Sequence, residues 1–405
     1  MGWRNRLGRA AVNLVISLLA VLATLGLLEI GMRLLTPGPV LIGFDSLWLP
    51  DPVLGWRLKP DSDVSVWTAG TMVRVSTNSH GWRDVEHTLA KPEGVFRILV
   101  LGDSFMEGDA VSDEDTFARQ LETVARQDGL ENVDVINMSV SGYGTLQSYL
   151  AYVEEGMSYS PDLVLLGFFN GNDVNDNYRP FQVASSGEAA FTVISRPFLE
   201  SSAQGEWVIM QPDYDRALEL YNQRQEWSLW HRSRALSVLA RVLATYWAEQ
   251  EKADPTGDGA APGDEFWADP DLCEEAPLFT EGWAVTERIL VELDDAVRES
   301  GAQLVVFTVP AREETDSEYS QQVVHTLEEL NILCLEKGES NQQALGVLER
   351  SGIPVVDLLP SFRVALNEEG RELYARDNHW NAEGYALAAE EVFEALSAQG
   401  FLPAQ

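Results

Sequence analysis

The stretch FRILVLGDSF, residues 96–105, carries the pattern that decides the fold. Phe96–Leu101 is an apolar run that ends at a glycine, which is typical of a strand buried on both faces of a parallel sheet. Ser104 follows the end of this strand. The amphipathic pattern after it predicts a helix with one apolar face, formed by Phe117, Leu121 and Val124. A strand followed by a helix is the repeating unit of a parallel sheet covered by helices.

The same alternation of strands and helices continues to the C-terminus. Four more apolar runs predict strands at Val133–Asn137, Leu163–Phe169, Ala302–Pro310 and Pro354–Leu358. Further helices are predicted over Trp283–Arg298 and from Asn381 onward. Right-handed crossovers place the carboxyl ends of such strands at one edge of the sheet, where binding sites lie. The sequence therefore predicts an α/β fold with about five parallel strands and helices on both faces.

The N-terminus has the pattern of a membrane anchor. Three arginines precede an uncharged, mostly apolar run from Ala10 to Leu28, which as a helix would be about 28 Å long, close to the thickness of the hydrocarbon core. This charge distribution predicts a cytoplasmic tail at residues 1–9, a transmembrane helix at residues 10–30 and an extracytoplasmic (periplasmic) remainder. No small-x-small cleavage site follows the run, so we expect an uncleaved single-pass anchor in the inner cell membrane rather than a signal peptide.

Two further regions differ from the strand–helix alternation. Residues 31–95 are rich in proline and glycine and predict an extended, β-rich strap between the membrane and a domain at residues 96–400. Residues 178–280 predict an insertion in that domain, with amphipathic helices in Tyr214–Trp247 followed by an acidic loop. This insertion is either a lid over the site or an element that only packs against the domain.

Composition limits the partners. The net charge is −36, and the acidic residues are spread along the whole chain, so the surface repels nucleic acid and we expect no nucleic-acid partner. The chain has two cysteines, Cys273 and Cys334, and outside the cytoplasm they could form a disulfide, although their spacing leaves this open. No histidine and cysteine cluster has zinc-ligand spacing, so neither a metal nor a cofactor is expected.

Four short segments carry the groups needed for acyl transfer. Ser104 offers a hydroxyl nucleophile, and His379, with Asp377 two residues before it, offers a base and the carboxylate that orients it. Residues i and i+2 of an extended segment project to the same side, so the carboxylate can contact one imidazole nitrogen while the other faces the serine. Three groups could donate to the oxyanion of a tetrahedral intermediate: the backbone N–H of Ser104, that of Gly142 and the side-chain amide of Asn172.

These segments resemble the four sequence blocks of the SGNH or GDSL hydrolase superfamily, which is named for its serine, glycine, asparagine and histidine. The blocks are similar to residues 102–105 (GDSF), 141–144 (SGYG), 170–173 (NGND) and 377–381 (DNHWN). The resemblance covers roughly residues 95–398 apart from the insertion. It implies a flavodoxin-like three-layer sandwich, a triad of Ser104, His379 and Asp377, and an oxyanion hole made by Ser104, Gly142 and Asn172.

Two positions depart from the superfamily pattern. Asn170 stands where the third block usually has glycine. The last block usually reads Asp-x-x-His, but the residue three before His379 is Arg376, so Asp377 must serve as the acid. The resulting Asp-x-His-Trp-Asn is similar to blocks in membrane-linked and periplasmic relatives of the alginate O-acetyltransferase type.

Three hypotheses for the function follow. The first is an extracytoplasmic serine esterase that removes small acyl groups, such as acetyl, from a glycan or a small ester. The second is a polysaccharide O-acetyltransferase that uses the same triad, passes the acyl group to a sugar hydroxyl and works with envelope polysaccharide machinery. The third is an anchored module that binds an envelope partner without catalysis.

Overall fold

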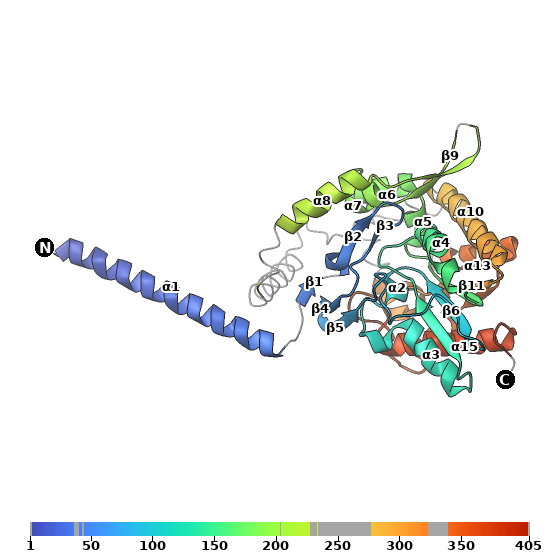
Figure 1. Ribbon diagram of the computed structural model, residues 1–405, viewed down its shortest axis with the longest axis horizontal. Coiled ribbons are helices and arrows are strands. Elements are labelled where there is room, and N and C mark those ends of the chain that lie inside the picture. Colours follow the sequence, from blue (N-terminus) through green and yellow to red (C-terminus); the bar gives the residue numbers. More distant parts are fainter. Residues whose placement is uncertain are drawn as a thin grey trace. The chain divides into compact units, whose positions relative to one another are not determined.

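The computed structural model describes residues 2–35, 40–42, 44–202, 204–226, 233, 277–322 and 339–403. The chain divides into two compact units, residues 1–41 with 222–259 and residues 42–221 with 260–405. The first unit contains helix α1 (Gly2–Leu35), drawn in dark blue in Figure 1. Its segment Val12–Gly31 is long and apolar enough to cross a membrane, and none of it is buried.

A five-stranded parallel sheet is the centre of the second unit, as predicted. The strand order is β12-β11-β8-β6-β7 and every pairing is parallel. The strands are β6 (Phe96–Leu101), β7 (Val133–Asn137), β8 (Leu163–Phe169), β11 (Gln303–Val309) and β12 (Val355–Asp357). Five apolar runs of the sequence thus became the five strands. Side chains on both faces of the sheet are buried, which explains why the runs do not alternate with polar residues.

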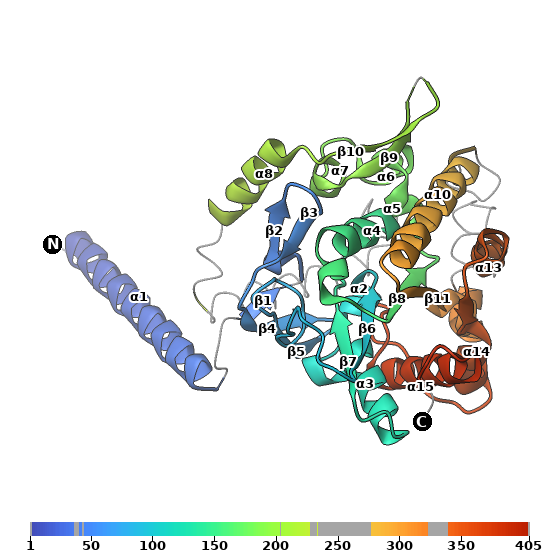
Figure 2. The same ribbon diagram turned by 45° about the vertical axis from the view of Figure 1, so that its right-hand side comes forward.

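Helices cover both faces of this sheet. Helices α3 (Phe117–Gln127), α14 (Leu359–Asn367) and α15 (Ala382–Ala398) share one apolar core with it. Helices α4 (Thr145–Glu154) and α10 (Pro277–Glu299) pack against each other, and Figure 2 shows them on the opposite side of the sheet. Other helices of the described part are α2 (Ser104–Glu107), α5 (Asp173–Asn177), α6 (Arg179–Ser186), α7 (Phe191–Ser195), α11 (Arg312–Thr315) and α13 (Glu339–Ser351).

Helix α15 shows why the C-terminal segment folds as it does. Asn381 caps the helix, because its side-chain oxygen accepts the backbone N–H groups of Glu383 and Gly384. Its apolar residues recur at helical spacing and are buried against α3, whose stripe begins with Phe117 and Leu121. The packing of α15 on α3 fixes the position of the residues just before Asn381.

The segment predicted as a β-rich strap contains five short strands. These are β1 (Val40–Ile42), β2 (Trp48–Asp51), β3 (Gly55–Leu58), β4 (Asp63–Thr68) and β5 (Thr71–Ser76). Strands β2 and β3 form one antiparallel pair, and β4 and β5 form another. Side chains from this segment are buried in the second unit, including Trp56, Trp82 and Arg83. The Arg83 guanidinium donates to the carbonyl oxygens of Gly108 at 2.5 Å and Val111 at 2.7 Å, in the loop that follows Ser104.

The predicted insertion is only partly described. It contains the hairpin β9 (Phe198–Ser201) and β10 (Trp207–Met210), together with helix α8 (Tyr214–Glu226). Apart from residue 233, the rest of the predicted helical stretch Tyr214–Trp247 lies outside the described residues, as do the acidic loop and both cysteines, Cys273 and Cys334. The lid and the disulfide therefore stay predictions, as do the domain boundaries.

Candidate active site

Ser104 lies at the carboxyl end of strand β6, on the first turn of α2. Asp103 caps this short helix, since its Oδ1 accepts the backbone N–H of Phe105 at 2.9 Å. Gly102 has a φ of +151°, and a Cβ at that position would lie 2.5 Å from the Met106 side chain. Only glycine lets the chain turn this sharply from strand to helix in so tight a space. The turn leaves Ser104 nearly buried at the edge of the sheet where the strands end.

His379 is held beside Ser104 by a tight loop that precedes α15. The backbone N–H of Ala375 donates to the His379 carbonyl oxygen at 2.7 Å. Asn378 between them has a φ of +67°, a left-handed conformation that asparagine tolerates better than most residues. The imidazole Nε2 lies 2.7 Å from Ser104 Oγ, and the ring packs at 4.8 Å from the Phe105 ring. The base and the hydroxyl are thus within hydrogen-bonding reach.

Asp377 contacts the other side of the same imidazole. Its Oδ2 lies 3.3 Å from His379 Nδ1, and its Oδ1 accepts the His379 backbone N–H, also at 3.3 Å. The Nδ1 contact has the distance of an ion pair, but Nδ1 has no well-aligned hydrogen bond to any described residue. Long contacts of this kind often tighten only when substrate binds.

Charge around the histidine favours its protonated form. Burial by itself lowers the pKa of His379, but the close contact with the Asp377 carboxylate and the negative charges of Asp109, Asp377 and Asp103 outweigh it, so the pKa lies above its ordinary value of 6.5. Burial raises the pKa of Asp377, whereas the close contact with the His379 ring and its positive charge lower it, with a net shift below 3.8. Asp377 is therefore ionised at neutral pH and can stabilise an imidazolium.

The segments that carry two of the predicted oxyanion donors, Asn172 and Gly142, are bonded to the residues next to Ser104. The Asn172 side-chain amide donates to Asp103 Oδ2 at 3.1 Å, which places it beside the nucleophile's loop. Gly142 lies in a turn with a φ of +77°. The residue before it, Ser141, donates its hydroxyl to Asp109 Oδ2 at 2.9 Å and its backbone N–H to Glu107 Oε2. Both segments are thus bonded to residues 103–109.

Sequence reasoning missed the buried acids on that loop. Glu107 and Asp109 are both buried, and burial is the main cause that raises each pKa. For Asp109 the positive charge of His379 and the Ser141 hydroxyl oppose this, and the pKa is about 7. Acidic residues three and five positions after a candidate nucleophile were the available clue, but no local pattern shows that they are buried and bonded to the distant Ser141.

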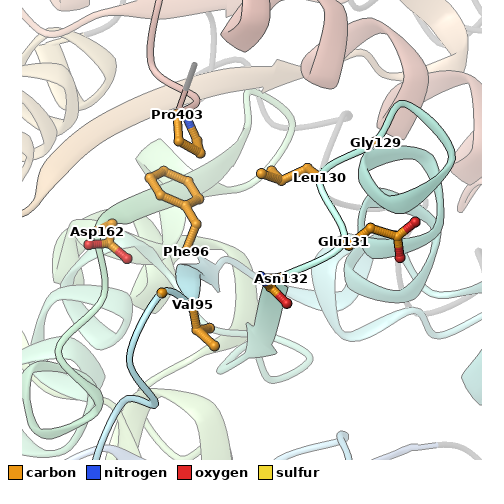
Figure 3. Close-up of a pocket in the computed structure, with 9 residues that line it drawn as sticks. Val95, Phe96, Gly129, Leu130, Glu131, Asn132, Asp162 and Pro403 are labelled. Carbon is orange, nitrogen blue, oxygen red and sulfur yellow. The ribbon is translucent and has the colours of Figure 1, made fainter. Parts of the chain in front are cut away.

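A surface hollow of about 430 Å³ lies at the other end of the sheet (Figure 3). It is lined by Gly94–Phe96, Gly129–Asn132, Asp162 and Pro403. Phe96 begins β6, and Asp162 immediately precedes β8, so the hollow is at the amino ends of these strands. Asp162 there pairs with Lys91 at 2.6 Å. The hollow is therefore separate from the candidate site. Among the described residues, no group of three or more His, Cys, Asp or Glu side chains could hold a metal ion.

The C-terminal third of the chain matches a known family. Residues 274–405 match the SGNH hydrolase-like domain of the acetyltransferase AlgX, and this part includes Asp377 and His379. The resemblance inferred from the four segments is confirmed there. No curated protein matches the chain.

Several solved structures are similar at low sequence identity. The acetyl xylan esterase AlAXEase is 12% identical with a TM-score of 0.38, over 74% of this chain and 100% of its own. A putative GDSL-like lipase from Parabacteroides merdae is 12% identical with a TM-score of 0.39, over 76% and 96%. A catalytic mutant of Axe2, an acetylxylan esterase from Geobacillus stearothermophilus, is 10% identical with a TM-score of 0.38, over 78% and 100%.

The family match, together with the sheet and the candidate site, identifies the chain as an enzyme of the serine hydrolase or acyltransferase class. The hypothesis of a non-catalytic module does not agree with this identification.

We expect the Asp377→Asn substitution to lower the pKa of His379, because it removes the negative charge and the acceptor next to Nδ1. The measurement is a pH titration of the imidazole NMR signals of full-length protein that carries isotope-labelled histidine. The His379 signal is assigned as the one that disappears in the His379→Gln variant. Asp84→Asn is the matched control. Asp84 contacts His87 at 3.1 Å, so this variant should lower only the pKa of His87, which is about 9. An unchanged His379 titration in Asp377→Asn would show that Asp377 does not act on this ring.

Proposed function

We propose that the protein is a membrane-anchored serine esterase that removes small acyl groups, acetyl among them, from a carbohydrate or a small ester outside the cytoplasm. The observation that supports it most is the 2.7 Å contact between Ser104 Oγ and His379 Nε2 at the carboxyl edge of the sheet. A hydroxyl is a weak nucleophile until a base in direct contact takes its proton, and this contact provides that base.

In the proposed reaction Ser104 Oγ attacks the ester carbonyl carbon while His379 Nε2 takes its proton. The carbonyl oxygen becomes an oxyanion, and the protonated histidine then gives its proton to the leaving alcohol, which produces an acyl-serine. Water attacks this intermediate while His379 takes its proton; the bond between the acyl carbon and Ser104 Oγ then breaks, His379 returns the proton to Oγ, and the acid leaves. Asp377 stabilises the imidazolium that forms in each half of the reaction.

Donors for the oxyanion are available around Ser104. The backbone N–H groups of Ser104 and Gly142 have no acceptor among the described residues. The Asn172 side chain carries two N–H groups and uses one on Asp103, so the second is free to face an oxyanion. Losing one such donor typically costs about 2.7–4 kcal/mol of transition-state stabilisation.

We expect full-length protein in detergent to hydrolyse p-nitrophenyl acetate, and Ser104→Ala and His379→Ala to lower kcat by at least about 10³-fold. The rate of p-nitrophenolate release measures kcat for the wild type and for both variants. His80→Ala is the matched control, since His80 pairs with Glu155, outside this site, and should keep the wild-type rate. Turnover by Ser104→Ala at the wild-type rate would exclude this serine as the nucleophile.

Acyl transfer to a sugar hydroxyl is the second candidate. The matching family is described as an acetyltransferase, and the Asp377-x-His379 spacing resembles that type. The chemistry is the same up to the acyl-serine, so the two functions differ only in whether water or a sugar hydroxyl attacks it.

Product analysis separates hydrolysis from transfer. With p-nitrophenyl acetate and rising concentrations of an acceptor oligosaccharide, the esterase proposal predicts free acetate equal to the p-nitrophenolate released. Mass spectrometry of the oligosaccharide is the second readout. An acetylated oligosaccharide that grows with acceptor concentration, at the expense of free acetate, would replace the esterase by a transferase.

We also propose that α1 anchors the enzyme in the inner cell membrane, with the catalytic part outside the cytoplasm. Support comes from the Val12–Gly31 span and from Arg4, Arg6 and Arg9 before it. Alkaline phosphatase fused after residue 405 should therefore be active, and the intact mass of the purified protein should include residues 1–30. An inactive fusion would contradict the orientation, and a mass lacking the N-terminal segment would indicate a cleaved signal peptide.

A further inference from the structure

A four-residue β-turn, such as the one that carries Gly142, can hold its central peptide in either of two opposite orientations. The backbone N–H of Tyr143 donates to the Val140 carbonyl oxygen at 3.0 Å, which closes a four-residue turn. Gly142, the third residue, has a φ of +77°, whereas Ser141 is not among the residues with positive φ, so the turn is of type II. The peptide between Ser141 and Gly142 is flipped by about 180° between types I and II. The turn type therefore decides in which direction this peptide presents its N–H and in which direction its carbonyl oxygen.

Trp56 fixes the orientation of that peptide. Its indole Nε1–H, from strand β3, donates to the Ser141 carbonyl oxygen at 3.1 Å. A trans peptide is planar, so its C=O and N–H point in opposite directions. Because the carbonyl oxygen is bound to Trp56, the Gly142 N–H must point away from the indole. No described residue accepts a hydrogen bond from it.

The flanking groups of the turn are bonded as well. The Arg196 guanidinium donates to the Gly142 carbonyl oxygen at 2.8 Å and is itself held by Gln147 at 2.7 Å and Asp176 at 3.1 Å. On the other side, Ser141 is bonded to the loop that follows Ser104. The turn is thus held by Arg196 of the insertion on one side and by the loop that follows Ser104 on the other.

The Trp56 ring cannot move away from this contact without disturbing its surroundings. It is fully buried and stacks on the Trp48 ring at 5.0 Å. The Tyr143 hydroxyl donates to the Trp56 carbonyl oxygen at 2.5 Å. A Cβ at Gly142 would lie 3.3 Å from Trp56 Cζ2, so the ring also fills the space next to the turn. Close packing of the ring on its neighbours holds the indole N–H in one place.

We infer that Trp56 is a positioning residue of the oxyanion hole: its indole N–H holds the Ser141–Gly142 peptide so that the Gly142 N–H faces the oxyanion that develops at Ser104. This inference rests on the proposed function. It means that the β2–β3 hairpin of the strap completes the active site, although it precedes the first strand of the catalytic sheet by some forty residues.

The test compares two tryptophan variants of the full-length protein with p-nitrophenyl acetate as substrate. Trp56→Phe keeps an aromatic ring but removes the N–H. We expect kcat to fall by about 10- to 100-fold, while KM stays within about twofold of the wild-type value and the midpoint of the pH profile of kcat is unchanged. Trp82→Phe is the matched control. Trp82 is equally buried in the same segment and donates its indole N–H to Glu155 instead, so its kcat should stay near wild type.

A second variant separates the lost N–H from lost packing. Replacing Trp56 by 3-benzothienylalanine keeps the size of the indole and substitutes sulfur for the N–H. If Trp56→Phe does not fold, this variant still shows whether the N–H is needed for kcat. A merely structural role predicts a lower melting temperature with no loss of kcat in the folded benzothienyl variant. That result, or an equal loss of kcat in Trp82→Phe, would overturn the inference. The proposed function would still stand in that case, as long as Ser104→Ala has a much lower kcat than the wild type. An inactive wild type would overturn the proposed function and this inference with it.

Discussion

The hydrogen bond between Ser104 Oγ and His379 Nε2 joins residues 275 positions apart, and the other features of the site depend on it. Two elements make it possible. Strand β6 ends at the nucleophile in a turn that only Gly102 can form, and helix α15 packs on α3 so that the loop before it reaches the same edge of the sheet. Both are properties of a parallel sheet whose strands end at one edge. The reactive pair is therefore a consequence of how the core packs.

Three buried acids lie on the loop that carries the nucleophile of this pair. Burial is the main cause that raises the pKa of Asp103, Glu107 and Asp109, and His379 opposes the shift at Asp103 and Asp109. Asp103 and Asp109 act on the histidine in the reverse sense, since their negative charges help to raise its pKa. Acids beside a base stabilise the imidazolium, which is the state that the base reaches in the transition state. The same loop also holds the turn of Gly142, so charge and geometry are set by one short segment.

The sheet could be predicted from the sequence because its signals are local. A run such as Phe96–Leu101 indicates a strand buried on both faces, and apolar residues at helical spacing predict α3 and α15. The role of the strap could not be predicted in this way. Trp56 and Arg83 have polar groups whose partners are residues far along the chain, and no local pattern shows which carbonyl an indole or a guanidinium will reach. The segment's glycines and prolines predict an extended, β-rich chain, but not that it packs on the catalytic loop.

Activation of the Ser104 hydroxyl by His379 underlies every step of the proposed reaction. It is tested most directly by reacting the full-length protein with a fluorophosphonate and mapping the adduct by mass spectrometry of its peptides. We predict one adduct on Ser104 in the wild type and, because the base is needed to activate the hydroxyl, its loss in a His379→Ala protein that remains folded. An adduct on another serine, or labelling of Ser104 that is independent of His379, would contradict the account.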